Sequence, residues 1–146
     1  MKRIYGLHEK QFRTLFERAS ARDGITGENM LIALETRLDN VIFRMGFAQS
    51  RNAARQIVRH RHVEVGGDVV DVPSFQVSPG HEVAIRPKSK QMASIQGSLE
   101  ARTRPPLVEW LALDEKNRIG RMTRRPTRQD IPLAVQEQLI VELYSK

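Results

Sequence analysis

The sequence predicts an α+β fold, in which a mostly helical body carries an inserted module made of a helix pair and a small antiparallel sheet. Two observations predict this fold. Apolar residues recur at helical spacing through most of the first 60 residues and again near the end of the chain. After His62 the pattern changes to short β-branched runs around a glycine pair, which is typical of a hairpin.

The first 36 residues predict two helices of the body. Residues Lys10–Arg22 carry apolar side chains at helical spacing, and Asp23-Gly24 predicts the end of that helix. Thr26 can cap a second helix. Thr36 and Asp39 have the spacing of a capping box, so we expect a break at Thr36 and the start of the module there.

The stretch from Arg37 to His62 predicts the helix pair. Gly46 can end the first helix in a left-handed conformation, and Ser50 can cap the second. In the first helix an apolar seam recurs every three or four residues; in the second, arginines fall four apart opposite an apolar side. The seam is Leu38, Val41, Ile42 and Met45, and the arginine row is Arg51, Arg55 and Arg59.

This stretch is strongly basic, with five arginines and no acidic residue between Asn40 and His62. A charged helix face is often only solvated, but such faces normally mix both signs. Because we expect no internal partner nearby, the row favours binding of phosphates, which the planar guanidinium can hold with two hydrogen bonds.

The sheet is predicted downstream of this stretch. Val63–Val65 and Val69–Val72 flank Gly66-Gly67, and glycine supplies the positive φ angles of a tight hairpin. His81–Ile85 alternates as a further strand.

The remaining chain is less regular. We expect a helix over Lys88–Leu99 with Ser89 as its cap, and a loop over Arg102–Pro106 because of its two prolines. Val108, Trp110 and Ala112 alternate like a strand, and Trp110 is predicted in the core. Arg118–Arg128 is predicted as a loop or edge strand, and Gln136–Tyr144 as a terminal helix that packs on the body.

Composition limits the classes of function. The 146 residues contain no cysteine, which excludes disulfides and thiolate metal sites, and the amino terminus lacks an apolar leader. We therefore expect a cytoplasmic protein with no membrane contact. Residues 1–62 hold 12 basic and 6 acidic residues, residues 63–100 hold 3 and 5, and residues 101–146 hold 9 and 6. A basic stripe beside a near-neutral middle predicts a polyanion-binding face.

The motifs RLDNVIFRMGFAQSRNAARQIVRH and VEVGGDVVDVPSFQVSPG resemble the bacterial small-subunit ribosomal protein S-four family. RIYGLHEKQF, TGEN and QLIVELYSK extend the resemblance over nearly the whole chain. The resemblance implies a structural constituent of the small ribosomal subunit, without enzymatic activity or cofactor. Such a protein is a primary binder of 16S ribosomal RNA, nucleates assembly of the subunit body and influences translational accuracy. Its implied partners also include ribosomal protein S-five and its own messenger RNA.

The resemblance and the charge pattern together define the expected RNA-binding residues. From the module these are Arg37, Arg44, Ser50, Arg51, Arg55, Arg59, His60, Arg61, His62, Lys88 and Lys90. From the amino-terminal segment they are Lys2, Arg3, Lys10 and Arg13. The expected domains are a first part of the helical body over 1–35, the module over 36–96, a linker and strand over 97–114, and a carboxyl-terminal part over 115–146.

Three features depart from the family pattern. The chain begins where relatives have a further basic arm, the hairpin reads Gly66-Gly67-Asp68 where a basic residue is common, and Gln136 replaces an asparagine cap. We expect the hairpin tip to contribute less to RNA attraction.

The sequence also allows three alternative interpretations. Arg37-Leu38-Asp39 resembles the catalytic segment of pseudouridine synthases, but no room remains for their catalytic domain, and Asp39 is better explained as a capping residue. His60 and His62 form a weak metal pattern without cysteine or adjacent acid. A stand-alone module that binds structured RNA outside the ribosome is the main alternative function.

Overall fold

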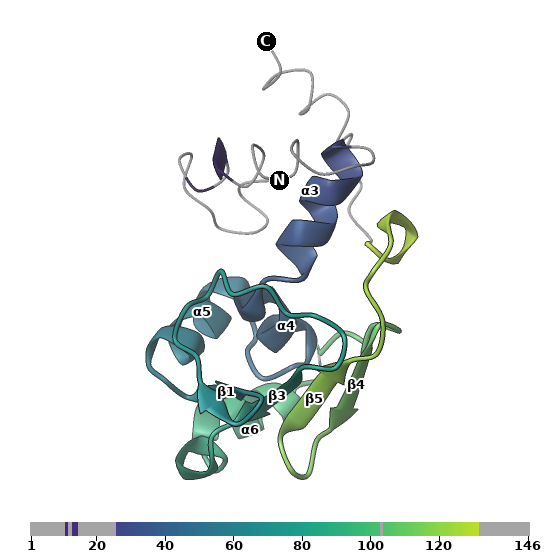
Figure 1. Cartoon of the computed structure of the whole chain (residues 1–146). Helices are drawn as coiled ribbons and strands as arrows, with labels where there is room; N and C mark the ends of the chain where they lie inside the picture. Colours follow the sequence, from purple (N-terminus) through teal and green to yellow (C-terminus); the bar gives the residue numbers. More distant parts are fainter. Residues whose placement is uncertain (1–10, 12, 15–25, 103, 132–146) are drawn as a thin grey trace. The chain divides into compact units, whose positions relative to one another are not determined.

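A computed structural model of the chain describes residues 11, 13–14, 26–102 and 104–131. The chain divides into two compact units, one formed by Met1–Glu35 with Pro126–Lys146 and one formed by Thr36–Arg125, and each is described by itself. The predicted terminal helix over 136–144 and most of the predicted helix over 10–22 lie outside the described residues. The second unit contains the predicted module and its sheet (Figure 1).

The first unit contains α3 (Thr26–Glu35) and the short 3-10 helix η2 (Arg128–Asp130). Helix α3 confirms the second predicted helix, and its apolar residues Met30, Leu31 and Leu34 are fully buried. Asp130 Oδ2 accepts a hydrogen bond from the Thr127 N–H at 2.7 Å, which fixes the start of η2.

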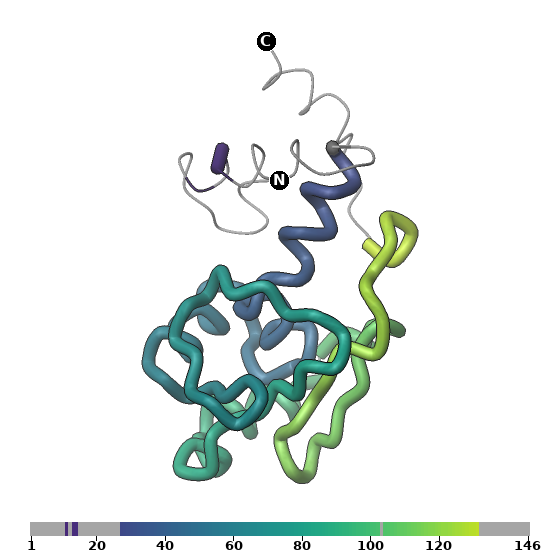
Figure 2. The backbone as a smooth tube through the Cα atoms, in the orientation of Figure 1, coloured from purple at the N-terminus to yellow at the C-terminus, as the bar shows by residue number. Residues whose placement is uncertain are grey.

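The predicted break at Thr36 is confirmed, because α3 ends at Glu35 and α4 (Leu38–Arg44) begins shortly after it. The predicted capping box is wrong. Thr36 Oγ1 donates to Gln76 Oε1 at 2.6 Å, and the first N–H groups of α4 donate to the Phe75 and Pro73 carbonyls. Carbonyls of a distant loop therefore satisfy donors that a side-chain cap would otherwise serve. Figure 2 shows this loop running back beside the start of α4.

The helix pair forms as predicted. Helix α4 is followed by Gly46 with a φ of +89°, and α5 (Arg51–Arg59) begins after Ser50, whose hydroxyl accepts from the Ala53 N–H at 3.0 Å. The seam residues Leu38, Val41, Ile42 and Met45 are all fully buried.

The sheet has five antiparallel strands in the order β2-β1-β3-β5-β4 (Figure 1). The predicted hairpin is confirmed, since Val65 pairs with Asp68 across Gly66 and Gly67, which have φ angles of +61° and +90°. The strands are β1 (Val63–Val65), β2 (Asp68–Val69), β3 (Glu82–Ile85), β4 (Leu111–Asp114) and β5 (Ile119–Met122).

The end of the sheet differs from the prediction. The stretch predicted as a loop or edge strand contains β5, an inner strand that pairs with both β3 and β4. The edge strand is β4, and it begins at Leu111, after Trp110, which is fully buried as predicted. Gly120 allows this placement, because a Cβ there would lie 2.5 Å from Met45 Cε.

The helix predicted over 88–99 is shorter. A 3-10 turn, η1 (Pro87–Ser89), follows β3, and α6 spans Ala93–Glu100 with Met92 at its N-cap position. Ser89 does not cap α6, because its hydroxyl lies 2.7 Å from His62 Nδ1.

The core of the second unit lies between the helix pair and the sheet. Helices α4 and α5 lie against one face of the sheet (Figures 1 and 2). Along β1 and β3 buried valine and isoleucine alternate with half-buried or exposed residues, so one face of the sheet packs on the core.

Candidate nucleic-acid interface

Asp39, at the start of α4, holds two arginines in the interior of the module. Arg37 donates to it through Nε and Nη2, both at 3.1 Å, and Arg55 donates through Nε at 3.4 Å. The Asp39 side chain is 5% exposed, and the Arg37 and Arg55 side chains are 8% and 13% exposed. A buried carboxylate with two guanidinium partners is a compensated charge, and the pair with Arg37 is bidentate.

Asn40, the next residue of α4, holds the first member of the arginine row. Its Oδ1 accepts from Arg51 Nε at 2.8 Å, and Asn40 is fully buried. The Arg51 guanidinium carbon also lies 4.6 Å from the centre of the Phe43 ring, close enough for a cation–π contact. Arg51 and Arg55 are thus fastened to α4 by hydrogen bonds.

The expectation that no internal partner lies near the arginines of residues 40–62 is therefore wrong for Arg55, which binds Asp39, and for Arg61, which pairs with the exposed Asp71. The window without acidic residues was counted from Asn40, and the carboxylate that binds Arg55 belongs to the residue just before it. Arg59 differs from these two arginines, because it is exposed and makes no ion pair with any residue that the structure describes.

A cluster of cations forms where α5 ends and β3 continues into η1. The Arg86 N–H donates to the His62 carbonyl at 2.9 Å, and Arg86 Nη1 donates to the Arg61 carbonyl at 3.3 Å. With the Ser89–His62 hydrogen bond, these contacts fasten the 86–90 segment to the end of α5. We call the resulting set the basic cluster, and it consists of Arg59, Arg61, Arg86, Lys88 and Lys90.

The basic cluster is available to solvent and weakly neutralised. Arg59, Arg61 and Lys88 are exposed, and Arg86 and Lys90 are half-buried. Within the described part of the chain its one ion pair joins Arg61 to Asp71 at 3.3 Å, with side chains 62% and 47% exposed. An exposed pair of this kind contributes little and can be exchanged for a phosphate.

Two histidines lie beside the basic cluster. The rings of His60 and His62 are 6.3 Å apart, edge to face. Burial lowers the pKa of His62 below its usual value of 6.5, and the nearby His60 and Arg86 lower it further. His62 is therefore mainly neutral at pH 7 and acts as a hydrogen-bond partner for Ser89.

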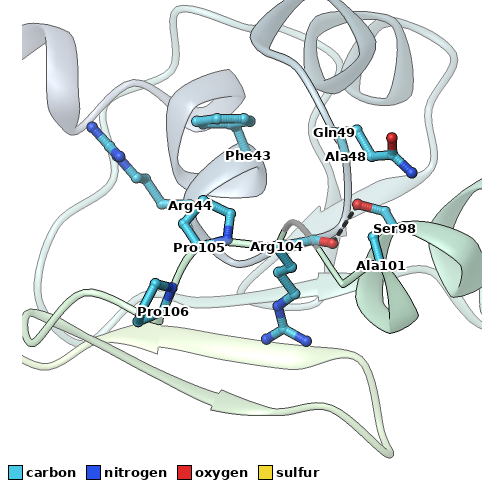
Figure 3. Close-up of a pocket in the computed structure, with 10 residues that line it drawn as sticks. Phe43, Arg44, Ala48, Gln49, Ser98, Ala101, Arg104, Pro105 and Pro106 are labelled. Carbon is cyan, nitrogen blue, oxygen red and sulfur yellow. Dashed lines mark hydrogen bonds between the residues drawn. The ribbon is translucent and has the colours of Figure 1, made fainter.

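A small pocket of the module is explained by packing (Figure 3). It measures about 90 Å³ and lies between α4 and the segment after α6. Ser98 Oγ donates to the Gly46 carbonyl at 2.7 Å, and Arg104 donates to Glu115 Oε1 at 2.6 Å. A Cβ at Gly46 would lie 2.6 Å from Arg104 Nε, so glycine makes room for this arginine.

Comparison with known proteins identifies the family. Residues 1–35 match the ribosomal protein S4/S9 N-terminal domain, and residues 36–83 match the S4 domain. The chain is 52% identical over its whole length to the small ribosomal subunit protein uS4 of Geotalea daltonii, and it covers 70% of that protein. The corresponding proteins of Myxococcus xanthus and Thermus thermophilus are 51% and 49% identical, with the same coverage. The chain belongs to the uS4 family.

Membership of the uS4 family confirms the predicted class of function. The chain is a structural protein of the small ribosomal subunit that binds ribosomal RNA, and it is not an enzyme. In the described part of the chain, no three His, Cys, Asp or Glu side chains gather as metal ligands would. None of the described helices combines the length and apolar character that crossing a membrane requires.

The other predicted RNA-binding residues of this uS4-family chain have varied positions. Ser50 is used as the cap of α5, and Arg44 is half-buried with its guanidinium carbon 5.8 Å from the Phe43 ring centre. Arg13 is exposed and helical. Lys2, Arg3 and Lys10 lie outside the described residues.

Arg86 was missed by the sequence prediction. It follows β3 and precedes two lysines, so the alternation of cations at 86, 88 and 90 after a strand was the available signal. The contacts with Arg61 and His62, which lie far earlier in the chain, show that this segment continues the end of α5.

Proposed function

We propose that this chain binds the RNA of the small subunit through the basic cluster, and that this contact helps to nucleate assembly of the subunit body. The observation that carries the proposal is the junction of α5 with the 86–90 segment. It brings together five cations, and among the described residues only one of them, Arg61, forms an ion pair, which is exposed.

The mode of binding follows from the chemistry of the cluster. Arginine and lysine side chains neutralise phosphates, and base edges are hidden in the deep major groove of an RNA helix. We therefore expect recognition of the shape and backbone of a folded RNA. Arg51 and Arg55, held by α4, contribute mainly by fixing α5, and Arg59 begins the phosphate-binding surface.

We extend the proposal to the properties that the family resemblance implies. These are contact with ribosomal protein S-five, an influence on translational accuracy, repression of its own messenger RNA, and location in the cytoplasm as part of the ribosome. Co-sedimentation of the chain with small subunits, and with small subunits that lack S-five, tests the proposed contact with S-five.

Footprinting of the full chain on naked 16S ribosomal RNA tests the RNA contact, together with a salt titration of the affinity. The plot of log affinity against log salt has a negative slope. Replacing Arg59 and Lys88 with alanine should make this slope less steep by about 1.5, since each neutralised phosphate contributes about 0.7–0.9 to its magnitude. Lys116→Ala, which removes an exposed charge in the β4–β5 turn, is the matched control and should leave the slope unchanged. An unchanged slope and footprint in the double variant would exclude the basic cluster as the contact.

A further inference from the structure

We propose that a groove beside the basic cluster binds one unstacked base of the RNA whose phosphates the cluster holds. The groove has a volume of about 340 Å³ and lies between α5, residues 47–49 and residues 92–94. The proposal deepens the proposed function and depends on it, because the base is delivered by an RNA bound at the cluster.

The groove has an apolar floor and a polar rim. Phe47 is fully buried beneath it, Ile57 is 8% exposed, and Met92 is half-buried. Gln49 and Gln56 stand exposed at the rim, and their amide groups make no hydrogen bond to any residue in the described ranges. An apolar floor beside the exposed amide groups of Gln49 and Gln56 matches the apolar faces and the polar edge of a nucleobase.

The groove lies on a different side of α5 from the arginine row. Ala53, Gln56 and His60 follow one another at three or four residues and line the groove, whereas Arg51 and Arg55 turn toward α4. At the end of the helix the two surfaces meet, because His60 and His62 line the groove and alternate with Arg59 and Arg61. When a base lies in the groove, the phosphates of its RNA strand therefore lie next to the basic cluster.

The lining favours a base over other ligands. It includes no carboxylate and no lysine or arginine, so it offers no charge for a charged small molecule or side chain. The histidine rings, 6.3 Å apart and steeply inclined to each other, offer aromatic surface at the rim. Unstacked bases are the parts of an RNA that proteins read by stacking and by hydrogen bonds to their edges.

The test separates a base contact from a phosphate contact. Ala53→Leu fills the groove from a helical position that tolerates leucine, and should weaken binding of the full chain to naked 16S ribosomal RNA about tenfold, within the range for one stacked base. The slope of log affinity against log salt should not change, because no phosphate contact is removed. In chemical probing, one base protected by the wild-type chain should become reactive with Ala53→Leu.

Controls keep the outcomes distinct. Ala112→Leu makes the same change at a half-buried strand residue outside the groove and should bind as the wild type does. Gln56→Ala changes an exposed residue of the same groove and should also weaken binding at constant slope. It therefore still tests the base contact if Ala53→Leu disturbs folding. Wild-type affinity in both groove variants, or a lower slope in either, would overturn the base contact. Failure of the wild-type chain to bind 16S ribosomal RNA would instead overturn the proposed function.

Discussion

Asp39 shows how a single carboxylate can organise a basic helix pair. Its two oxygens accept hydrogen bonds from Arg37, Arg55 and the Asn40 N–H, with almost no exposure to water. Charges removed from water are costly unless they are paired, so each of these groups depends on the others. Asp39 therefore acts as an ion-pair partner that connects α4 with α5, and not as the capping residue that the sequence predicted.

Asp39→Asn should destabilise the module strongly. The amide keeps the shape of the side chain but removes the Asp39 carboxylate from the Arg37 and Arg55 guanidinium groups, which costs about 3 kcal/mol in comparable buried pairs. Urea denaturation followed by the fluorescence of Trp110, the one tryptophan of the chain, measures this loss. Asp68→Asn, at the exposed hairpin, is the control and should change the free energy of unfolding by less than about 0.5 kcal/mol. A comparable effect of both substitutions would contradict the role of Asp39.

His62 should make the stability of the module depend on pH. Burial, His60 and Arg86 lower its pKa in the folded chain below the 6.5 of the unfolded chain. The unfolded chain therefore binds the proton more readily, and the free energy of unfolding should fall as the pH is lowered through 6.5. Urea midpoints at pH 7.5 and 5.5 measure this fall, which should be smaller in His62→Gln. His60→Gln should retain most of it, because burial is the main cause of the shift. An equal fall in wild type and His62→Gln would assign the pH dependence to other groups.

At the scale of elements, two glycines of the module should respond to substitution by alanine in opposite ways, because one follows a helix and the other lies inside one. Gly46, after α4, has a φ of +89° and leaves no room for a Cβ beside Arg104, whereas Gly97 lies inside α6 with nothing within 4 Å of an added Cβ. Gly46→Ala should lower the free energy of unfolding by about 1–2 kcal/mol. Gly97→Ala should raise it by about 0.5–1 kcal/mol. Thermal or urea unfolding of the two variants checks the opposite signs, and a loss in both would show that α6 is constrained in another way.

Elements set by local chemistry were predictable from the sequence. The helix pair follows from the spacing of Leu38, Val41 and Ile42, and the hairpin follows from the need for positive φ at Gly66 and Gly67. Elements set by distant partners were not. Strand β5 has a short, irregular pattern, and it becomes an inner strand only because β3 and β4 pair with its two edges.

The polar residues of the candidate site follow the same rule. Ser50 caps the helix that directly follows it, as predicted, whereas Thr36 and Ser89 bond to Gln76 and His62, which lie 40 and 27 residues away. A hydroxyl can serve either a local backbone donor or a distant side chain, and the sequence alone does not decide between them. The burial of Arg55 and the placement of Arg86 also depend on such distant contacts.

At the scale of the whole molecule, the cations of the module divide between folding and binding. Arg37 is buried, Arg55 is half-buried, and both are paired with Asp39, whereas Arg59 and Lys88 are exposed at the basic cluster. The 24 lysines and arginines of the chain therefore overstate the number of cations that can meet an RNA, because Arg37 and Arg55 are engaged within the fold. Spacing along a helix does not reveal this division, since Arg55 and Arg59 belong to the same row.

The division predicts opposite effects for two neighbouring arginines of one helix. Arg55→Ala should lower the free energy of unfolding by about 1.5 kcal/mol, because it removes a hydrogen bond to a buried charge. Its slope of log affinity against log salt should stay close to that of the wild type. Arg59→Ala should leave the stability within about 0.5 kcal/mol of the wild type, and should lower the slope by about 0.7–0.9. Urea unfolding and salt titration of binding to 16S ribosomal RNA, made on both variants, measure the two effects. Equal slopes for the two variants would mean that burial does not separate the folding arginines from the binding ones.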